Sequence, residues 1–311
     1  MMRGTFFRYL AKCYLRNSFS EFGKWFIWSR IVIPNVDRWG EALVTKTKDG
    51  LKYNVKFPDV IQMYIYFFGI WEPVITRYFK STLSKGDIVI DVGANIGYFT
   101  CLSSKLVGET GSVHAIEASP SIFGLLRQNV NLNNISNTNL YNHAVFNKSS
   151  NLKLFKSKAD NIGATSLFER DDVSSKFETV IKSDKLSDIV GMEVLKKANL
   201  IKIDIEGAEW FAIDGIKDVI SEVKADWLVE IDPKEIEKRG GNLHDMMAVF
   251  YENGFSAYQI DNIYDVSWYM KDNIDIRLEE LKSDFTVRKD VIFTRKGVGE
   301  LYSLFEKRYL R

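Results

Sequence analysis

Short apolar runs alternate with segments of helical periodicity along most of this 311-residue chain. The runs are rich in valine and isoleucine and are bounded by polar or glycine-containing turns, which is typical of buried strands. Strands are predicted at 88–91, 112–117, 139–145, 152–155, 178–181, 200–205, 227–231, 256–260 and 290–294, and helices at 73–83, 98–107, 120–132, a segment ending near 220, and 243–253. Such alternation builds a mostly parallel sheet with helices on both faces, so the sequence predicts an α/β, Rossmann-like fold.

The region before this alternating core has a different character. Two strands, at 42–47 and 51–56, flank an Asp-Gly turn and predict a hairpin. We expect four parts: a basic, aromatic helical segment at 1–40, a hairpin and helix lead-in at 41–82, the α/β domain at 83–297, and a helical tail at 298–311.

The first 30 residues combine aromatic and basic side chains. Six lysines and arginines stand against Glu21 alone, and Phe7, Leu10 and Tyr14 fall at helical spacing on one side. Such a segment could lie on an anionic membrane surface. Alternatively, the helix packs its aromatic side on the domain or on a second subunit of a homodimer.

The composition of the chain limits its possible cellular locations and its possible binding partners. The longest uncharged apolar run, 60–71, is too short to span a bilayer, and basic residues interrupt any secretory signal. The only cysteines, Cys13 and Cys101, lie far apart and predict neither a metal site nor a disulfide framework. A net charge of +1 gives no general reason to expect nucleic acid. We expect a cytoplasmic protein, membrane-associated if the first 30 residues bind lipid.

The segment 86–100 carries the most informative motif. An apolar strand ends in Asp91, and the turn Gly93-Ala94-Asn95-Ile96-Gly97 leads into a helix at Tyr98. A dinucleotide site needs an additional glycine so that the backbone can approach the pyrophosphate, but here Ala94 and Asn95 stand between the two glycines. Asp91 would repel a diphosphate and would suit a cationic ligand. The turn therefore favours S-adenosylmethionine (SAM) over NAD.

Two further positions fit an adenosyl ligand. Glu117 ends the second predicted strand, where an acid in a Rossmann-like sheet accepts hydrogen bonds from ribose hydroxyls; alternatively, it is a solvated carboxylate. His143 and Ala144 close the third strand, where the adenine edge is expected. His143 could equally be a loop histidine with its hydrogen bonds satisfied.

The segment 200–209 is the second informative motif. Isoleucines occupy one face of the predicted strand, and Lys202, Asp204 and Glu206 alternate on the other. A central parallel strand is normally apolar on both faces, so these groups need partners or a cleft. Open α/β sheets place their sites at the carboxyl ends of strands. Alternatively, Lys202 pairs with an acid, Glu209 included, in a structural network.

Together these motifs resemble the FkbM family of SAM-dependent methyltransferases. The resemblance rests on Asp-Val-Gly-Ala-Asn-Ile-Gly-Tyr-Phe-Thr at 91–100 and Lys-Ile-Asp-Ile-Glu-Gly-Ala-Glu at 202–209, supported by Glu72-Pro73, Glu117-Ala118-Ser119-Pro120 and the segment 163–166. It implies a mostly parallel seven-stranded sheet and methyl transfer to a hydroxyl oxygen of a sugar or another small molecule. The family often carries a histidine soon after the acid of the fifth strand, whereas Ile231-Asp232-Pro233 follow Glu230 here.

We expect the following site. The cofactor-binding residues are Glu72, Asp91, Gly93, Ala94, Asn95, Gly97, Tyr98, Glu117, Ala118, Ser119, His143, Ala144 and Asp204, and the catalytic candidates are Asp204, Glu206, Glu230 and His244. Asp204 or Glu206 would act as the base toward the acceptor hydroxyl. A divalent metal shared by Asp204 and Glu230 is the disfavoured alternative, and no metal is expected.

Other functions stay open at this point. The alternatives are an NAD(P)-dependent oxidoreductase and a non-catalytic binding module with the same fold. The presence of acids at Asp91, Glu117 and Asp204 argues against a degraded site. The chain has no Pro-Pro dipeptide and so lacks the motif of amino-methylating nucleic-acid enzymes. The expected partner is a small-molecule or glycan acceptor.

Overall fold

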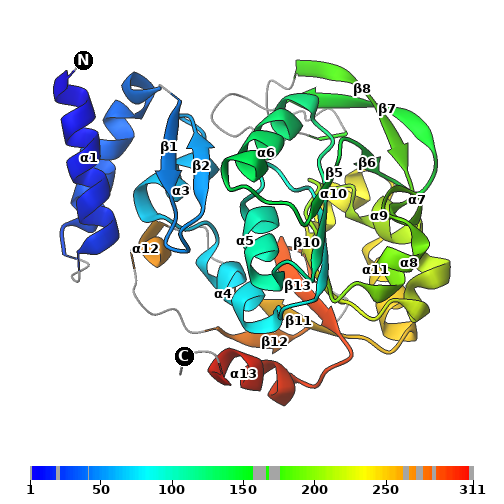
Figure 1. The fold of residues 1–311 in the computed structure, drawn as a ribbon. Coiled ribbons are helices and arrows are strands. Elements are labelled where there is room, and N and C mark those ends of the chain that lie inside the picture. The colour runs from blue at the N-terminus through cyan, green and yellow to red at the C-terminus, as the bar shows by residue number, and fades with distance from the viewer. Residues whose placement is uncertain are drawn as a thin grey trace.

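A central eight-stranded sheet organises the chain in the computed structural model (Figure 1). The structure describes residues 2–18, 22–40, 42–156, 166–167, 176–261, 266–270, 276–281 and 285–307, without the side chains of 2–5, 306 and 307. In spatial order the strands are β12 (Leu278–Glu280), β11 (Ser256–Ile260), β13 (Lys289–Thr294), β10 (Asp226–Ile231), β9 (Leu200–Ile203), β3 (Ile88–Val92), β4 (Ser112–Ile116) and β5 (Thr138–Tyr141). The five strands from β10 to β5 are parallel, and β13 runs antiparallel between β10 and β11. The predicted Rossmann-like sheet is confirmed, and β12 is an unpredicted eighth strand.

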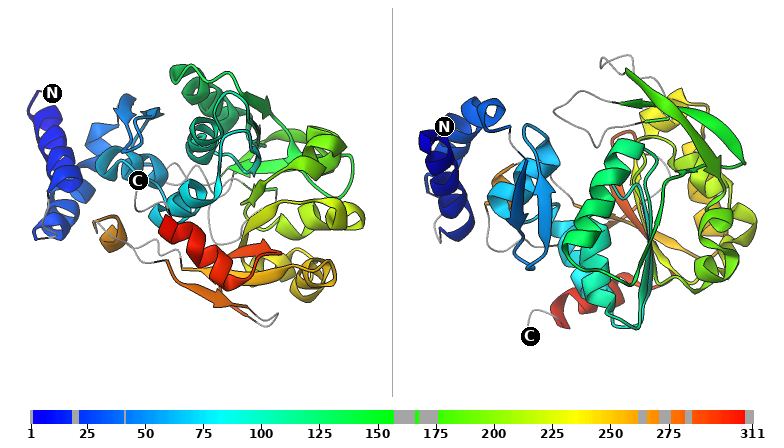
Figure 2. Two further views of the ribbon diagram at one scale, coloured as in Figure 1. Left: turned by 60° about the horizontal axis from the view of Figure 1, so that its bottom comes forward. Right: turned by 45° about the horizontal axis from the view of Figure 1, so that its top comes forward.

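Helices cover both faces of this sheet (Figure 2). One face carries α4 (Pro73–Thr82), α5 (Tyr98–Val107), α6 (Pro120–Leu132) and α13 (Val298–Lys307); the other carries α7 (Leu186–Val190), α8 (Met192–Lys197), α9 (Glu209–Asp214), α10 (Pro233–Lys238) and α11 (Leu243–Glu252). α3 (Val60–Phe68) lies farther out, where it contacts the first helix and the N-terminal hairpin. Successive strand residues alternate between the two cores: Leu200 packs with the first group and Ile201 with the second. By the same alternation, Lys202 points to the face that α5 covers.

The predicted strand at 139–145 is wrong in one respect, because it is two strands. β5 ends at Tyr141, and β6 (Ala144–Val145) joins β7 (Ser150–Lys156) and β8 (Lys176–Asp184) in a separate three-stranded sheet. Asn142 lies at the break, where its side-chain amide donates to the carbonyls of Glu117 and Ala118 at 2.8 and 3.0 Å. These two hydrogen bonds hold the chain where it leaves the main sheet. The predicted motif residues 163–165 lie outside the described residues.

The N-terminal helices form a layer at one edge of the molecule. α1 (Met2–Asn17), α2 (Lys24–Ile27), the π-helical turn Trp28–Val32 and the 3-10 helix Ile33–Trp39 precede the hairpin of β1 (Leu43–Lys46) and β2 (Lys52–Val55). Figures 1 and 2 show α1 on the far side of α3 from the main sheet. No helix in the described ranges has the length and apolarity to cross a bilayer.

The side of α1 that packs against the rest of the chain is not the aromatic side that we expected. Arg8, Ala11 and Leu15 are buried, whereas Phe7 and Leu10 are exposed. The prediction that the aromatic side packs on the domain is therefore wrong. The reason lies in the basic residues, which turn inward to reach backbone carbonyls.

Arg16 makes the most extensive of these inward contacts. Its guanidinium donates to the carbonyls of Ile65 and Tyr66 at 2.7 and 3.0 Å and to the Thr45 hydroxyl at 3.1 Å. Both carbonyls belong to the last turn of α3, and that of Ile65 also accepts the N–H of the C-cap residue Gly69 at 3.1 Å, so Arg16 adds a second donor there. Arg16 thus fastens α1 to both the hairpin and α3.

Replacing Arg16 should therefore loosen the N-terminal layer. Arg16→Met removes the guanidinium donor from the carbonyls of Ile65 and Tyr66 and from the Thr45 hydroxyl, so the free energy of unfolding in urea should fall by about 2 kcal/mol. Arg30→Met is the matched control, because Arg30 is exposed, and it should change the free energy by no more than about 0.5 kcal/mol. Equal losses in the two variants would contradict this role of Arg16.

Candidate active site

A cavity of about 350 Å³ opens at the carboxyl ends of the central parallel strands. A volume of this order suits a ligand of cofactor size. The expected site residues that line it are Glu72, Asp91, Gly93, Ala94, Asn95, Tyr98, Glu117, Ala118, His143, Ala144, Asp204, Glu206 and Glu230. They come from β3, β4, β6, β9 and β10 with their following loops and from the start of α4, so residues far apart in sequence meet at one edge of the sheet.

The glycine turn after β3 brings two backbones into direct contact. Gly93 has a φ of 81°, and a Cβ at this position would lie 1.8 Å from the carbonyl oxygen of Asp204. The loop after β3 therefore rests on the loop after β9, and only glycine can occupy this point.

Asp91 offers an unpaired acceptor at the cavity wall. Its Oδ2 accepts from the Thr100 hydroxyl at 2.6 Å, while its Oδ1 is buried with no hydrogen-bond partner among the described residues. Burial raises the pKa of Asp91 above its ordinary value, although the Lys202 ammonium opposes the shift. A buried carboxylate oxygen that lacks a donor fits the cationic ligand that the sequence predicted.

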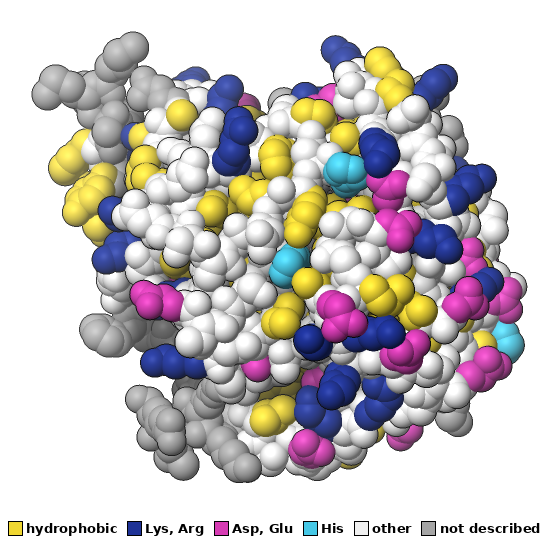
Figure 3. All heavy atoms as spheres, turned by 45° about the vertical axis from the view of Figure 1, so that its right-hand side comes forward, with side chains coloured by type: hydrophobic (Ala, Val, Ile, Leu, Met, Phe, Trp, Pro, Cys, Tyr) yellow, Lys and Arg dark blue, Asp and Glu magenta, His cyan; other side chains and the backbone are white. Residues whose placement is uncertain are grey.

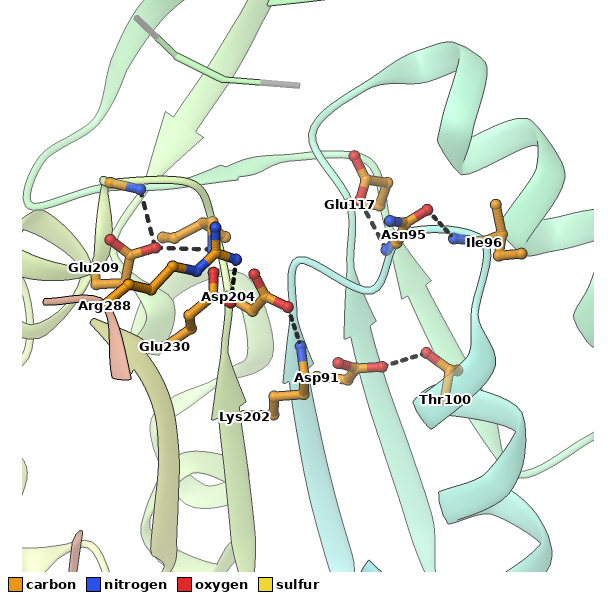
Figure 4. A network of polar contacts seen from close by, with 12 residues as sticks. Asp91, Asn95, Ile96, Thr100, Glu117, Lys202, Asp204, Glu209, Glu230 and Arg288 are labelled. Atoms are coloured by element: carbon orange, nitrogen blue, oxygen red, sulfur yellow. Dashed lines mark hydrogen bonds and ion pairs between the residues drawn. The ribbon is translucent and has the colours of Figure 1, made fainter. Parts of the chain in front are cut away.

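Glu117 connects two loops beneath the cavity (Figure 4). Its Oε2 accepts from the backbone N–H of Asn95 at 2.9 Å, and its Oε1 accepts from that of Ser119 at 2.8 Å. Burial raises the pKa of Glu117 to about 7, and these two backbone bonds only partly offset the shift. The carboxyl lines the cavity as expected, and its contact with a ribose stays a prediction.

Two acids and two cations form a chain on the other side of the cavity (Figure 4). Lys202 Nζ lies 2.7 Å from Asp204 Oδ2, and the Arg288 guanidinium pairs with Glu230. Asp204 and Glu230 are themselves hydrogen-bonded. Asp204 is the more open member, with 30% of its side chain exposed against 7% for Glu230.

Their surroundings shift the pKa values of Asp204 and Glu230 in opposite directions. Burial would raise the pKa of Asp204, but Lys202 and Arg288 outweigh it and lower that pKa below its ordinary value. Burial and the Asp204 charge raise the pKa of Glu230 well above its ordinary value. The surroundings thus favour the charged form of Asp204 and disfavour the charged form of Glu230.

The loop after β9 is held by a third acid. Glu209 is buried, and its Oε1 accepts from the backbone N–H groups of Ile205 and Gly207 at 3.0 and 3.1 Å. Between them, Glu206 has a φ of 54° and lines the cavity. Glu209 thus orders the loop that carries Asp204 and Glu206 through backbone hydrogen bonds, and the acid that pairs with Lys202 is Asp204.

Three expected site residues do not line the cavity. Gly97 precedes α5 with a φ of 89° and packs against Leu126, and Ser119 is a fully buried N-cap of α6. Both act through the conformation of the loops. His244 is 77% exposed on α11, beside Asp245, so the expectation that it completes the cleft is wrong.

Comparisons with known proteins bear on this geometry. A family profile described as the methyltransferase FkbM domain matches residues 91–257, which is more than half of the chain. The chain belongs to the FkbM methyltransferase family.

This FkbM-family chain has distant relatives. Methyltransferase 1 of Beauveria bassiana (strain ARSEF 2860) is 26% identical over 148 residues, which cover 42% of this chain and 58% of that protein. The 31-O-demethyl-FK506 methyltransferase FkbM of Streptomyces tacrolimicus is 26% identical over 203 residues, 56% of this chain and 75% of that protein. A solved FkbM methyltransferase from Methylobacillus flagellatus KT is 17% identical, with a TM-score of 0.40 over 69% of this chain and 47% of that chain. The chain thus spans less than two thirds of the Beauveria protein, and its own strand order defines its fold.

Family membership decides between the open alternatives. The matching profile describes a methyltransferase domain and not a nicotinamide oxidoreductase, and the cofactor of such a domain is SAM. The partnerless oxygen of Asp91 and the absence of a glycine cradle for a pyrophosphate agree with this cofactor.

Several residues that line the cavity were not predicted from the sequence. They are Val60, Ile61 and Trp71 before α4, Leu154 and Leu167 around the small sheet, and Arg288. Arg288 precedes β13, which pairs with β10 through Asp290 and Glu230. Only the strand order places it beside the acids, and no local pattern marks it.

Glu117 should make the stability of the protein depend on pH. Its folded pKa of about 7 exceeds the ordinary value, so the stability that Glu117 contributes is full below about pH 4.5 and is lost as the pH rises through 7. Compared with Glu117→Gln, the wild type should lose on the order of 3 kcal/mol of unfolding free energy between about pH 4.5 and 8. Urea unfolding of both proteins across this range measures the difference, and a pH-independent difference would contradict the raised pKa.

Proposed function

We propose that the protein transfers the methyl group of SAM to a hydroxyl oxygen of a small molecule or a glycan sugar. The observation that carries this proposal is the hydrogen-bonded Asp204–Glu230 pair at the cavity, in which Lys202 lies 2.7 Å from Asp204 and the pKa values of the two carboxyl groups shift in opposite directions. The Streptomyces tacrolimicus relative is named for transfer to an oxygen, which supports the choice of atom.

The residues at the ends of β3 and β4 would hold the donor. Asp91 has a free acceptor oxygen for a cationic group, the backbone from Gly93 to Asn95 forms the loop, and Glu117 orders it. SAM, when bound, supplies an electrophilic methyl group on a positively charged sulfur. A wall of carboxylates suits that charge.

Asp204 is positioned to accept the proton of the acceptor hydroxyl. It is ionised at neutral pH, it faces the cavity, and it is hydrogen-bonded to Glu230. As Asp204 takes up the hydroxyl proton, the oxygen becomes a stronger nucleophile. A pair of carboxyl groups whose pKa values are driven apart is a frequent arrangement for acid–base work.

Lys202 and Arg288 are positioning residues in this scheme. The Lys202 ammonium fixes one oxygen of Asp204, and Arg288 fixes the Glu230 carboxyl. Burial alone would lower the pKa of Lys202, but the charges of Asp204 and Asp91 raise it above its ordinary value, so the cation persists. The charged form of Asp204 therefore persists as well.

The remaining wall suits an acceptor with an apolar side. Val60, Ile61 and Trp71 lie on one side of the cavity, and Leu154 and Leu167 contribute from the small sheet. The CH groups of a sugar ring or of a macrocycle can pack against such side chains while one hydroxyl reaches Asp204.

Asp204→Asn should separate cofactor binding from chemistry. The variant should bind SAM with a Kd within about threefold of the wild type, and its kcat should fall by about 100-fold or more because the amide cannot accept the proton. The assay uses methyl-labelled SAM with a panel of hydroxylated sugars and small molecules, and NMR locates the label. Calorimetry gives the Kd.

His244→Ala is the matched control, because His244 is exposed and away from the cavity. It should keep wild-type turnover. Full turnover by Asp204→Asn with SAM bound would rule out Asp204 as the base. Label on carbon or nitrogen of every accepted substrate would rule out transfer to oxygen.

A further inference from the structure

The N-terminal layer presents an outer aromatic face to solvent. Its members are the exposed side chains of Phe6, Phe7, Tyr9, Leu10, Phe22, Trp25, Phe26 and Ile33. Phe22 is 85% exposed and Trp25 is 60% exposed. The Tyr14 hydroxyl donates to the carbonyl of Phe22 at 2.5 Å and joins the end of α1 to the start of α2, so both helices contribute to one surface. Hydrophobic side chains gather at the left edge of Figure 3, over these helices.

The basic residues of the same helices lie beneath this face. Arg8 donates to the carbonyl of Trp39 at 3.3 Å, Lys12 to the hydroxyl of Thr45 at 3.0 Å, and Lys24 to the carbonyl of Met270 at 2.9 Å. A water-soluble surface helix normally has the reverse arrangement, with cations outward and aromatic rings inward. The basic side chains of these helices thus bind the rest of the protein, and the aromatic side chains are exposed to solvent.

Charge is distributed unevenly along the chain in the same region. Residues 1–40 carry seven lysines and arginines against two acids, whereas the whole chain carries 42 against 41. Arg30 and Arg38 are exposed in the same N-terminal layer, as is Asp37. The N-terminal layer is therefore positive, and the rest of the molecule is negative.

We infer that the outer aromatic face binds the interfacial region of an anionic phospholipid bilayer. Tryptophan, tyrosine and phenylalanine are the side chains that settle at the headgroup level, and neighbouring cations attract anionic lipids. A second copy of the chain fits less well, because a two-fold contact through this face would bring two positive layers together. This inference does not depend on which acceptor is methylated.

Sedimentation of the full chain with vesicles tests the inference. The vesicles are phosphatidylcholine alone, or phosphatidylcholine with roughly a quarter phosphatidylglycerol. The wild type should pellet with the anionic vesicles, and less so in about 0.5 M NaCl. Trp25→Ser/Phe26→Ser should weaken partitioning by about tenfold or more.

Phe177→Ser is the matched control, because Phe177 is exposed on β8, away from the N-terminal layer. It should partition within about twofold of the wild type. Phe6→Ser/Phe7→Ser provides a second test on α1, and thermal unfolding with SAM binding checks that each variant is folded. A wild type that fails to pellet, or folded double variants that pellet equally well, would overturn the inference. So would a lipid-free dimer in sedimentation velocity that Trp25→Ser/Phe26→Ser dissociates while vesicles have no effect.

Discussion

One buried cation joins the two halves of the candidate active site. Lys202 lies on β9 in register with Asp91 on β3, and its ammonium pairs with Asp204 and lies 5.4 Å from the Phe99 ring centre. A buried carboxylate such as that of Asp91 would be costly without a cation beside it. The adjacency of β3 and β9 in the sheet therefore lets one ammonium favour the charged forms of both acids. The donor side and the acceptor side of the cavity depend on this single side chain.

Much of the fold could be predicted from the sequence because its signals are local. The strand periodicity, the glycine turn and the acids at 204 and 206 each lie within one short segment, and the structure brings them together at one cavity. The break between β5 and β6 could not be predicted, because it depends on the contact of Asn142 with a loop about 25 residues earlier. α3 was also missed, because a run that is apolar at almost every position gives only a weak helical period.

The errors in the site have a similar physical origin. Arg288 comes from a segment without any motif, and it reaches Glu230 only because β13 inserts between β10 and β11. His244 was expected near the cleft, yet the helix that carries it turns that side chain to solvent. The side on which α1 packs was predicted wrongly for another reason. Hydrophobic periodicity finds an amphipathic helix, but it does not reveal that arginines such as Arg16 will bind carbonyls inside.

The contact between Gly93 and the carbonyl of Asp204 has a consequence for how this enzyme could change over time. At this point two backbone segments are in direct contact. The shape of the SAM-binding loop is therefore set by backbone geometry and hardly at all by the surrounding side chains. The rest of the cavity is lined by side chains near the small sheet, in α3 and between α3 and α4. These side chains can be substituted without moving the SAM-binding loop. New acceptors could therefore be accommodated by substitution on one wall alone, with methyl donation left intact.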